Sequence, residues 1–372
     1  MTLYICLTTL KKRYIFIAND CALRKSDPFR LGKLKMKRPT LKDLAEMTGF
    51  SAATVSRALN DHPRISRKAK NRIIETARKV GYQPNLIARG LREKKSYLIG
   101  LIIYDLQNSF HAAVTRSILE EAQYEGYQVI IRSTMDHASG VIEAIEDMRR
   151  AGVDGIIITA TRLEESSLED LIKEQFPVVQ LMRRLEKNTG VQIVPDGAYG
   201  IQMLVTHLLR IGHQKIAMIG GPDDLSTSRT RYEAYYQALQ ENNVPVDRNL
   251  VLKGCAFSYE TGYKFCKILL RQVSKPDAIV CADDLIAFGA MQVIDEAGLS
   301  IPEDIAVVGF DDCDMSAHPR IQLTSVKYDM KLLAQLAVKS LLEQIDGLIP
   351  VHKLIDIVPQ LVVRKTCGYL KG

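Results

Sequence analysis

The chain has 372 residues, 47% of them hydrophobic and 25% charged, so it is long enough for two or three folded domains and too apolar for general disorder. Its net charge of +7 is divided unevenly. Residues 1–96 hold 23 Lys and Arg against 7 Asp and Glu, whereas residues 97–372 hold 27 against 36. This basic head on an acidic body predicts that the head binds a polyanion and that the body has a different task.

Disulfide-framed, zinc-binding and membrane-spanning proteins are not expected. The seven cysteines form no CxxC pair and fit reduced thiols, so we expect neither a metal nor another cofactor. There is no run of about 18 apolar residues, the length that a membrane span needs. Within residues 1–35, Lys11-Lys12-Arg13 breaks any signal-peptide core. We expect residues 1–35 to be a disordered extension or the product of an upstream start codon, and the protein to be cytoplasmic.

Residues 36–82 predict three short helices. Thr40 is a suitable N-cap for the first helix, which Gly49 ends, and Ser51 caps a second helix over Ala52–Leu59. Ser66 caps a third helix, which runs to about residue 80. Two short helices joined by a Thr-Gly-Phe turn are typical of a helix-turn-helix DNA-binding domain.

Residues 83–96 are predicted to be a linker with marginal helical propensity. Asn85 could cap a helix here, but Gly90 and several like charges weaken it. Such a helix needs a partner to form.

From residue 97 onward, short apolar runs alternate with amphipathic helices. Strands that are apolar on both faces and alternate with helices predict parallel sheets in a doubly wound α/β fold. About ten such strands exceed one small sheet, so we expect two similar lobes. The predicted N-lobe covers about 97–195 and 327–354, and the predicted C-lobe covers about 196–326 and 355–372. The apolar runs are 98–103, 127–132, 153–158, 178–181, 192–194, 215–219, 250–253, 278–281 and 305–309.

Polar residues follow many of these runs. In parallel sheets, ligands bind beyond the carboxyl ends of the strands, so these residues could hold a small molecule between two lobes. The alternative for each is that it caps the following helix. The set comprises Asp105, Ser133, Thr159, Arg183, Asp196, Asp283 and Asp311.

Residues 40–368 resemble the LacI/GalR family of bacterial transcription repressors. The most specific stretch is TLKDLAEMTGFSAATVSRALN at 40–60, followed by GYQPN at 81–85 and ARGL at 88–91. Later matches are AVVGFDD at 306–312 and LTSV at 323–326. The resemblance implies a helix-turn-helix head, a hinge helix and a periplasmic-binding-protein-like core. It also implies a homodimer that binds a near-palindromic operator in double-stranded DNA, at the nucleoid.

The second helix is expected to enter the major groove, with its N-terminal residues at base edges. Arg57 could contact a guanine through two hydrogen bonds; the alternative is a phosphate contact only. Thr54 and Ser56 could donate to phosphates, Ala52 and Ala53 permit close approach, and Val55 is predicted to be core. In the hinge, the resemblance assigns Leu91 as a wedge in the minor groove; the alternative is that it packs on the core. The full predicted DNA-binding set is Thr40, Ser51, Ala52, Ala53, Thr54, Ser56, Arg57, Asn60, Tyr82, Asn85, Ala88, Arg89 and Leu91.

The resemblance also implies an effector cleft that takes a sugar or a sugar derivative. Asp311 matches a sugar-binding aspartate, and Arg231 matches an arginine that grips hydroxyls or carboxylates. Two aspartates and an arginine suit a sugar, because carboxylates accept from hydroxyls and a guanidinium donates. Phe110 and His111 match a ring-bearing loop over the cleft, whereas Asp284 and Asp312 are expected to be helix caps. The predicted effector-binding set is Phe110, His111, Thr159, Arg183, Arg231, Asp283, Asp311 and Tyr328.

Three departures from the family pattern concern the ligand. Met182 stands where an aspartate is frequent, Ala234 replaces a frequent glycine, and Tyr328 stands where glutamine is common. They affect the identity of the ligand and leave the fold unchanged.

The prediction is a repressor of carbohydrate-use genes whose operator affinity a sugar controls. An α/β enzyme is a weaker alternative, because Gly220-Gly221-Pro222 lacks GxGxxG spacing and neither His207 nor His213 lies in a nucleophile motif. A sugar sensor without DNA binding is the other alternative, and the basic head opposes it.

Overall fold

The computed structural model describes residues 39–59, 62–82, 90, 93–134, 138–159, 170–182, 190–223, 225–254, 256–348 and 353–369. The chain divides into two compact units, one up to Asn85 and one from Leu86 onward. Each unit has its own hydrophobic core.

The first unit is a three-helix head, formed by α1 (Leu41–Thr48), α2 (Ala52–Leu59) and α3 (Arg67–Val80). Leu44, Val55 and Ile73 are fully buried, one from each helix, so the core position predicted for Val55 is confirmed. The caps are also as predicted. The hydroxyl of Thr40 accepts from the Asp43 amide (3.3 Å), and the Asp43 carboxylate accepts in return from the Thr40 amide (2.7 Å).

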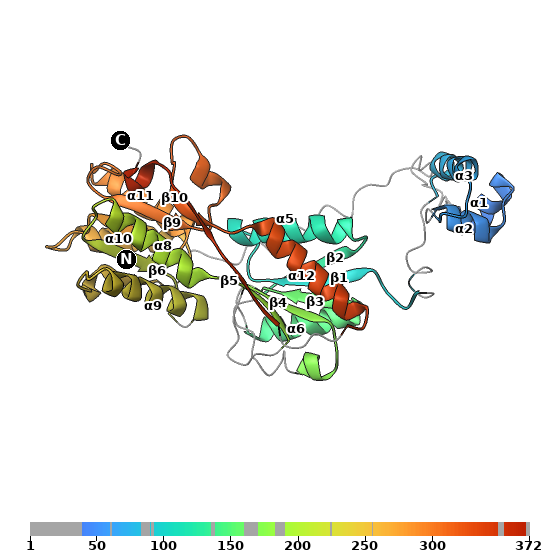
Figure 1. Cartoon of the computed structure of the whole chain (residues 1–372), viewed down its shortest axis with the longest axis horizontal. Helices are drawn as coiled ribbons and strands as arrows, with labels where there is room; N and C mark the ends of the chain where they lie inside the picture. The colour runs from blue at the N-terminus through green and yellow to red at the C-terminus, as the bar shows by residue number, and fades with distance from the viewer. Residues whose placement is uncertain are drawn as a thin grey trace, which may run out of the picture. The chain divides into compact units, whose positions relative to one another are not determined.

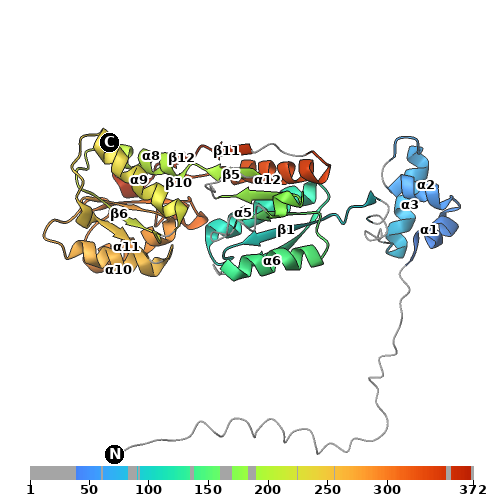
Figure 2. The same ribbon diagram turned by 90° about the horizontal axis from the view of Figure 1, so that it is seen from below.

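The second unit contains two parallel-type sheets side by side, each of six strands within the described residues (Figures 1 and 2). The sheet of the N-lobe has the order β11-β5-β4-β3-β1-β2, and all its pairs are parallel. The sheet of the C-lobe has the order β12-β10-β9-β8-β6-β7 and is parallel except for the β10–β12 pair.

The strands and helices of the two lobes have the following bounds. The N-lobe strands are β1 (Leu98–Ile103), β2 (Gln128–Ser133), β3 (Gly155–Ile158), β4 (Val178–Leu181), β5 (Val191–Pro195) and β11 (Lys353–Ile357). The C-lobe strands are β6 (Ile216–Gly220), β7 (Val251–Lys253), β8 (Ala278–Cys281), β9 (Ala306–Phe310), β10 (Thr324–Lys327) and β12 (Gln360–Val362). The N-lobe helices are α5 (Ser109–Tyr124), α6 (Ala138–Arg150) and α12 (Met330–Ile345), and the C-lobe helices are α8 (Gly197–Arg210), α9 (Ser226–Glu241), α10 (Tyr259–Leu270) and α11 (Asp284–Glu296). Short 3-10 turns are η1 (Arg248–Leu250), η2 (Asp314–Ala317) and η3 (Lys365–Cys367).

Three strands were not predicted. β10, β11 and β12 read TSVK, KLIDI and QLV, which are short and carry polar or charged residues among the apolar ones. β11 and β12 are edge strands, where one side faces solvent and the apolar pattern weakens. Because β11 continues to Ile357 within the N-lobe sheet, the last crossing between lobes lies after residue 357 and not after 354.

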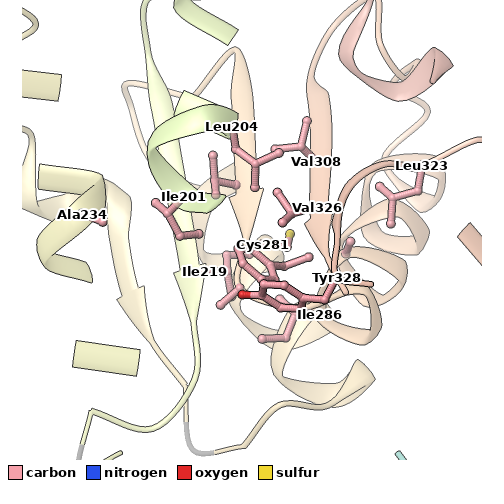
Figure 3. Packing of buried hydrophobic residues seen from close by; sticks show 14 of the residues in the cluster. Ile201, Leu204, Ile219, Ala234, Cys281, Ile286, Val308, Leu323, Val326 and Tyr328 are labelled. Atoms are coloured by element: carbon pink, nitrogen blue, oxygen red, sulfur yellow. The ribbon is translucent and has the colours of Figure 1, made fainter. Parts of the chain in front are cut away.

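One of the crossings between the two lobes places Tyr328 at their junction. The chain passes from one lobe to the other after β5, after β10 and after β11. Tyr328 follows β10 directly and is 2% exposed. Figure 3 shows its ring in the buried cluster that includes Val326, Cys281 and Ile286 of the C-lobe.

Candidate functional site: a DNA-reading head and an interlobe cavity

The exposed face of α2 carries the predicted base-reading residues. Val55 and Ala58 turn into the core, whereas Ala53 and Arg57 are exposed. The Ser51 hydroxyl accepts from the Thr54 amide (3.1 Å) and also lies 2.9 Å from the Thr54 hydroxyl. Ser51 therefore caps α2, as predicted, and keeps Thr54 close to the helix start.

The other predicted head residues have mixed positions. Ala52 and Ser56 are half-buried on α2, and Thr40 is exposed while capping α1. Tyr82 packs against the head core, and this burial raises its pKa. Asn60, Asn85, Ala88, Arg89 and Leu91 lie outside the described residues.

The described head is strongly basic. Residues 39–59 and 62–82 carry nine Lys and Arg against three Asp and Glu. Such a surplus attracts phosphate backbones independently of base sequence. Arg57, the predicted base-reading residue, is exposed on α2.

A cavity of about 320 Å³ lies between the two lobes. Seven of the eight predicted effector-binding residues line it, and Arg183 lies outside the described residues. The seven are Phe110, His111, Thr159, Arg231, Asp283, Asp311 and Tyr328. Four of the residues that follow strands, Thr159, Asp196, Asp283 and Asp311, line this cavity, so the carboxyl ends of strands from both sheets lie at it.

The rule also selected residues that do not line the cavity. The Asp105 carboxylate accepts from the Gln107 amide (2.8 Å) and holds a turn. The Ser133 hydroxyl donates to the Tyr104 carbonyl (2.9 Å). The Asp105 bond lies within its own turn, whereas the Ser133 bond joins the end of β2 to the residue that follows β1. Tyr104 itself lines the cavity.

Phe110 and His111 belong to the first turn of α5, at a place where the family resemblance implied a loop. Asn108 caps this helix by accepting from the Phe110 amide (2.9 Å). The His111 ring lies 5.6 Å from the Tyr104 ring and 5.7 Å from the Phe110 ring. Burial lowers the pKa of His111 to about 4, so its imidazole is neutral at physiological pH. Its Nδ1 is buried without a hydrogen-bond partner among the described residues, so a ligand could supply one.

Arg231 on α9 is the cation of the described cavity wall. Its guanidinium lies 3.9 Å from the centroid of the Phe310 ring, donates to the Ala282 carbonyl and comes within 4.0 Å of the Asp311 carboxylate. Its Nε is buried without a hydrogen-bond partner in the part of the chain that the structure describes. Arg231 is therefore held in place by the protein and still has a donor to offer.

Two carboxyls face this guanidinium. Asp311 has φ +100°, directly after β9, and burial raises its pKa well above the ordinary value although Arg231 opposes the shift. Asp283 caps α11 by accepting from the Ile286 amide (2.7 Å). Burial raises its pKa to about 7. Both carboxyls can accept hydrogen bonds from ligand hydroxyls when ionised.

The predicted helix caps need correction. Asp283, and not Asp284, is the N-cap of α11. The Asp284 carboxylate instead accepts hydrogen bonds from the hydroxyls of Ser316 and Ser325, 2.6 Å each. Asp312 forms an ion pair with Arg364 (2.6 Å) and caps no helix. Spacing along the chain could not reveal these partners, because they come from distant segments.

Tyr328 touches both lobes. Its ring centroid lies 6.3 Å from that of Phe110 in the N-lobe and 5.7 Å from that of Phe310 in the C-lobe. Met182, the other departure at the cavity, also lines it and has φ +77°. The Tyr328 ring thus lies between aromatic rings of the two lobes, at a position where glutamine is common in the family.

Sequence reasoning missed Phe257. It lines the cavity just before Ser258, the N-cap of α10, and lies 5.9 Å from the Arg231 guanidinium. It follows β7, so the strand-end rule could have found it. Phe257 was not predicted because the strand-end candidates were limited to polar residues.

Four thiols and two histidines of the described C-lobe lie outside the cavity lining. Cys266, Cys281, Cys313 and Cys367 are free thiols. His207 Nε2 lies 3.3 Å from the Cys367 sulfur, and His213 Nε2 lies 3.3 Å from the Cys367 carbonyl oxygen. These contacts attach η3 to the end of α8.

The buried Asp283 should make stability depend on pH. Between its ordinary pKa near 3.8 and the folded value of about 7, the folded protein holds a proton that the unfolded chain has lost. The free energy of unfolding therefore falls as pH rises through this window. Burial is the largest cause of this raised pKa; the Asp284 carboxylate adds to it, and Arg231 opposes it.

Asp283→Asn keeps the cap oxygen and cannot ionise. We expect it to raise the free energy of unfolding more at pH 8 than at pH 5, with an upper bound of about 4 kcal/mol at pH 8. Urea unfolding at both pH values measures this difference. An equal effect at pH 5 and pH 8 would contradict the prediction.

Comparison with known proteins agrees with the geometry of both units. Residues 40–85 match the family model of bacterial regulatory proteins of the lacI family, and residues 205–367 match a periplasmic binding protein-like domain. The transcriptional repressor PurR of Haemophilus influenzae (strain PittEE) is 30% identical over 331 residues, which cover 88% of this chain and 98% of PurR. The probable transcriptional repressor ExuR of Bacillus subtilis (strain 168) is 32% identical over 310 residues, which cover 82% of this chain and 91% of ExuR.

Solved structures show the same architecture. The lac repressor dimer bound to operator and the anti-inducer ONPF has a TM-score of 0.76 and 28% identity, covering 89% of this chain and 99% of that one. The complex of the transcriptional regulator CelR with cellobiose has a TM-score of 0.66 and 25% identity, covering 88% of this chain and all of that one.

The chain therefore belongs to the LacI family of bacterial regulatory proteins. It is a DNA-binding transcriptional repressor and not an enzyme. Within the described residues, no helix combines the length and the apolar character needed to cross a membrane.

Proposed function

We propose that this repressor acts at the nucleoid as a homodimer on a near-palindromic operator and controls genes of carbohydrate uptake or catabolism. A sugar or sugar derivative in the interlobe cavity switches its operator affinity. The lac repressor, a structural neighbour, is a dimer on its operator, and CelR holds cellobiose. Both support a sugar-responsive dimer.

The observation that carries this proposal is the pairing of hydrogen-bonding groups with aromatic faces in the cavity. Arg231 Nε and His111 Nδ1 are buried without partners among the described residues, and the Asp311 carboxyl, within 4.0 Å of the Arg231 guanidinium, lines the same cavity. Phe110 and Phe257 supply apolar surface from opposite lobes. A sugar combines ring C–H faces with a rim of hydroxyls, so it can satisfy both kinds of surface.

Switching requires that the effector favour one lobe arrangement over another. The cavity is built from both lobes, so a ligand bound there has contacts that depend on the angle between them. We propose that this angle controls the hinge over residues 83–96, in which Leu91 would wedge into the minor groove. A hinge helix that is only marginally stable by itself forms when it pairs with the hinge helix of the second subunit on DNA. A small rotation of one lobe can therefore unfold it.

The first test is operator binding by the purified full chain. The DNA is the region upstream of its own gene, with a scrambled duplex of equal length as the control. Binding is measured at two salt concentrations, with and without a panel of neutral hexoses and pentoses, uronic acids and purine bases. Purines are included because Phe110 and Phe257 could also stack on a flat ring.

Each outcome of this test has a distinct meaning. Specific binding that one sugar relieves supports an inducible repressor, and binding that needs a sugar indicates a corepressor. Relief by a purine alone would reject the sugar effector. Equal, purely salt-dependent binding to both duplexes would reject a specific operator, and an absence of DNA binding together with sugar binding would indicate a sensor.

Arg57→Ala is expected to reduce discrimination between operator and scrambled DNA by roughly 1–3 kcal/mol, because it removes a base-reading guanidinium from the exposed face of α2. Arg72→Ala on α3 is the control, since it removes an equal charge from a different helix of the same head; Arg72 lies 5.9 Å from the Phe50 ring. Competition binding measures the ratio. If Arg57→Ala weakens binding to both duplexes equally, Arg57 contacts phosphate only.

A further inference from the structure

Asp284 is buried behind the cavity and does not line it. Its Oδ1 accepts from the Ser325 hydroxyl (2.6 Å), and its Oδ2 accepts from the Ser316 hydroxyl (2.6 Å) and the Cys313 amide (2.8 Å). The acid thus connects the start of α11 with β10 and with η2. Three donors on one buried carboxylate make this a fully satisfied polar cluster.

The segment that this cluster holds has an unusual backbone. Asp311 and Asp312 both have positive φ, +100° and +48°. Consecutive left-handed residues other than glycine persist only when the surrounding structure over-determines them. Removing contacts from this segment is therefore expected to let its backbone relax.

Two hydrogen bonds donated by successive backbone amides hold this segment in place. The Asp311 amide donates to the Val326 carbonyl (2.8 Å), and the Asp312 amide donates to the Ser325 hydroxyl (3.1 Å). Ser325 then donates to Asp284, so Asp284 is linked to the residue next to Asp311 through one hydroxyl.

Gly309 shows how closely Asp284 approaches this strand. A Cβ on Gly309 would lie 2.3 Å from Asp284 Oδ1, a distance that real Cβ atoms do not adopt. On the other side, Arg364 forms an ion pair with Asp312 (2.6 Å) and donates to the Leu323 carbonyl (2.6 Å). The Asp311–Asp312 backbone is therefore anchored from two directions.

We propose that Asp284, acting through Ser325 and Ser316, is a positioning residue that holds the Asp311 carboxyl in the effector cavity. This inference rests on the proposed function, because it assigns to Asp311 a contact with the effector. Asp284 itself touches no ligand. Its effect on effector binding passes entirely through the conformation of residues 311–313.

The test uses the full chain with Ser325→Ala and Ser316→Ala, each of which removes one hydroxyl and spares the buried carboxylate. Ser228→Ala is the matched control, because its hydroxyl is also buried in the C-lobe but has no hydrogen-bond partner among the described residues. Hydrogen exchange at the amides of residues 311–313, without ligand, is the first measurement. We expect Ser325→Ala to speed exchange at residue 312 about tenfold and Ser228→Ala to leave it unchanged.

The second measurement is the dissociation constant for each panel member that the unaltered chain binds. Ser325→Ala is expected to weaken binding about tenfold, as for the loss of a hydrogen bond to a charged group. In an Asp311→Asn background, the same substitution should have less than about a twofold further effect, because both act on one contact. Operator affinity without effector should stay unchanged.

The two proposals fail in different ways. If the unaltered chain binds no panel member, the sugar effector is rejected, and the exchange rates alone decide whether the cluster holds this segment. If exchange at residues 311–313 is unchanged in both serine variants, the positioning role is overturned. Equal losses of affinity with and without the Asp311 carboxylate would overturn it as well.

Discussion

Arg231→Ala is expected to keep operator binding and lose the effector response, with effector affinity lowered at least about a hundredfold. Arg231 packs over Phe310 and near Asp311 in the cavity, and its unpartnered Nε is available to a ligand. A buried hydrogen bond to a charged group and the desolvation of its partners support a loss of this size. Truncation also leaves the Asp311 and Asp283 carboxyls without their nearest cation, which raises their pKa further.

The matched control is Arg229→Ala, two residues earlier on the same helix, where the arginine is exposed and does not line the cavity. Titration of the effector into an operator complex measures both affinities for each variant. Arg231→Lys separates charge from shape, because a lysine keeps the charge without the planar fork. If Arg231→Ala responds to the effector as the unaltered chain does, the cavity is not the effector site.

Gly262→Ala is expected to destabilise the protein by about 3 kcal/mol or more, despite the higher helix propensity of alanine. Gly262 in α10 and Gly289 in α11 lie where the two helices cross. A Cβ on Gly262 would lie 1.9 Å from the Ile286 carbonyl oxygen, and one on Gly289 would lie 2.0 Å from the Tyr259 carbonyl oxygen. Both clashes are with backbone, so the helices themselves must separate.

Gly126→Ala is the control for this substitution. Gly126 has φ +81° and nothing within 4 Å of its Cβ position, so alanine there is expected to cost only about 1–2 kcal/mol of backbone strain. Urea unfolding of both variants measures the difference. Similar costs would show that α10 and α11 adjust easily. Because α11 begins beside Asp283, a shift of this helix should also weaken effector binding.

The head and most of the strands could be predicted because their signals are local. Thr40, Ser51 and Ser66 cap the helices that they were predicted to cap, and Val55 lies in the core. The strands that were missed, such as Thr324–Lys327, have mixed polarity. Their pairing partners come from distant parts of the chain, and no local pattern identifies them.

Strand-end positions and the family resemblance identified seven effector-binding candidates that line the cavity, but not the role of each side chain. Asp283 and Asp284 are adjacent in sequence, yet one caps α11 beside the cavity and the other anchors the chain behind it. The difference arises because Ser316 and Ser325 meet Asp284 only in the folded C-lobe.

The sequence by itself determined the helix-turn-helix head, the alternation of strands and helices, and the set of polar residues at strand ends. Each of these depends on periodicity, capping and spacing, which short stretches of chain carry. The tertiary structure alone decided that Phe110, Tyr328, Phe310 and Arg231 form one wall across two lobes, and that Asp284 supports Asp311. Those contacts join residues up to about two hundred positions apart in the sequence. The side chains become buried only after both sheets have formed, and this burial then determines their protonation state and their hydrogen-bond partners.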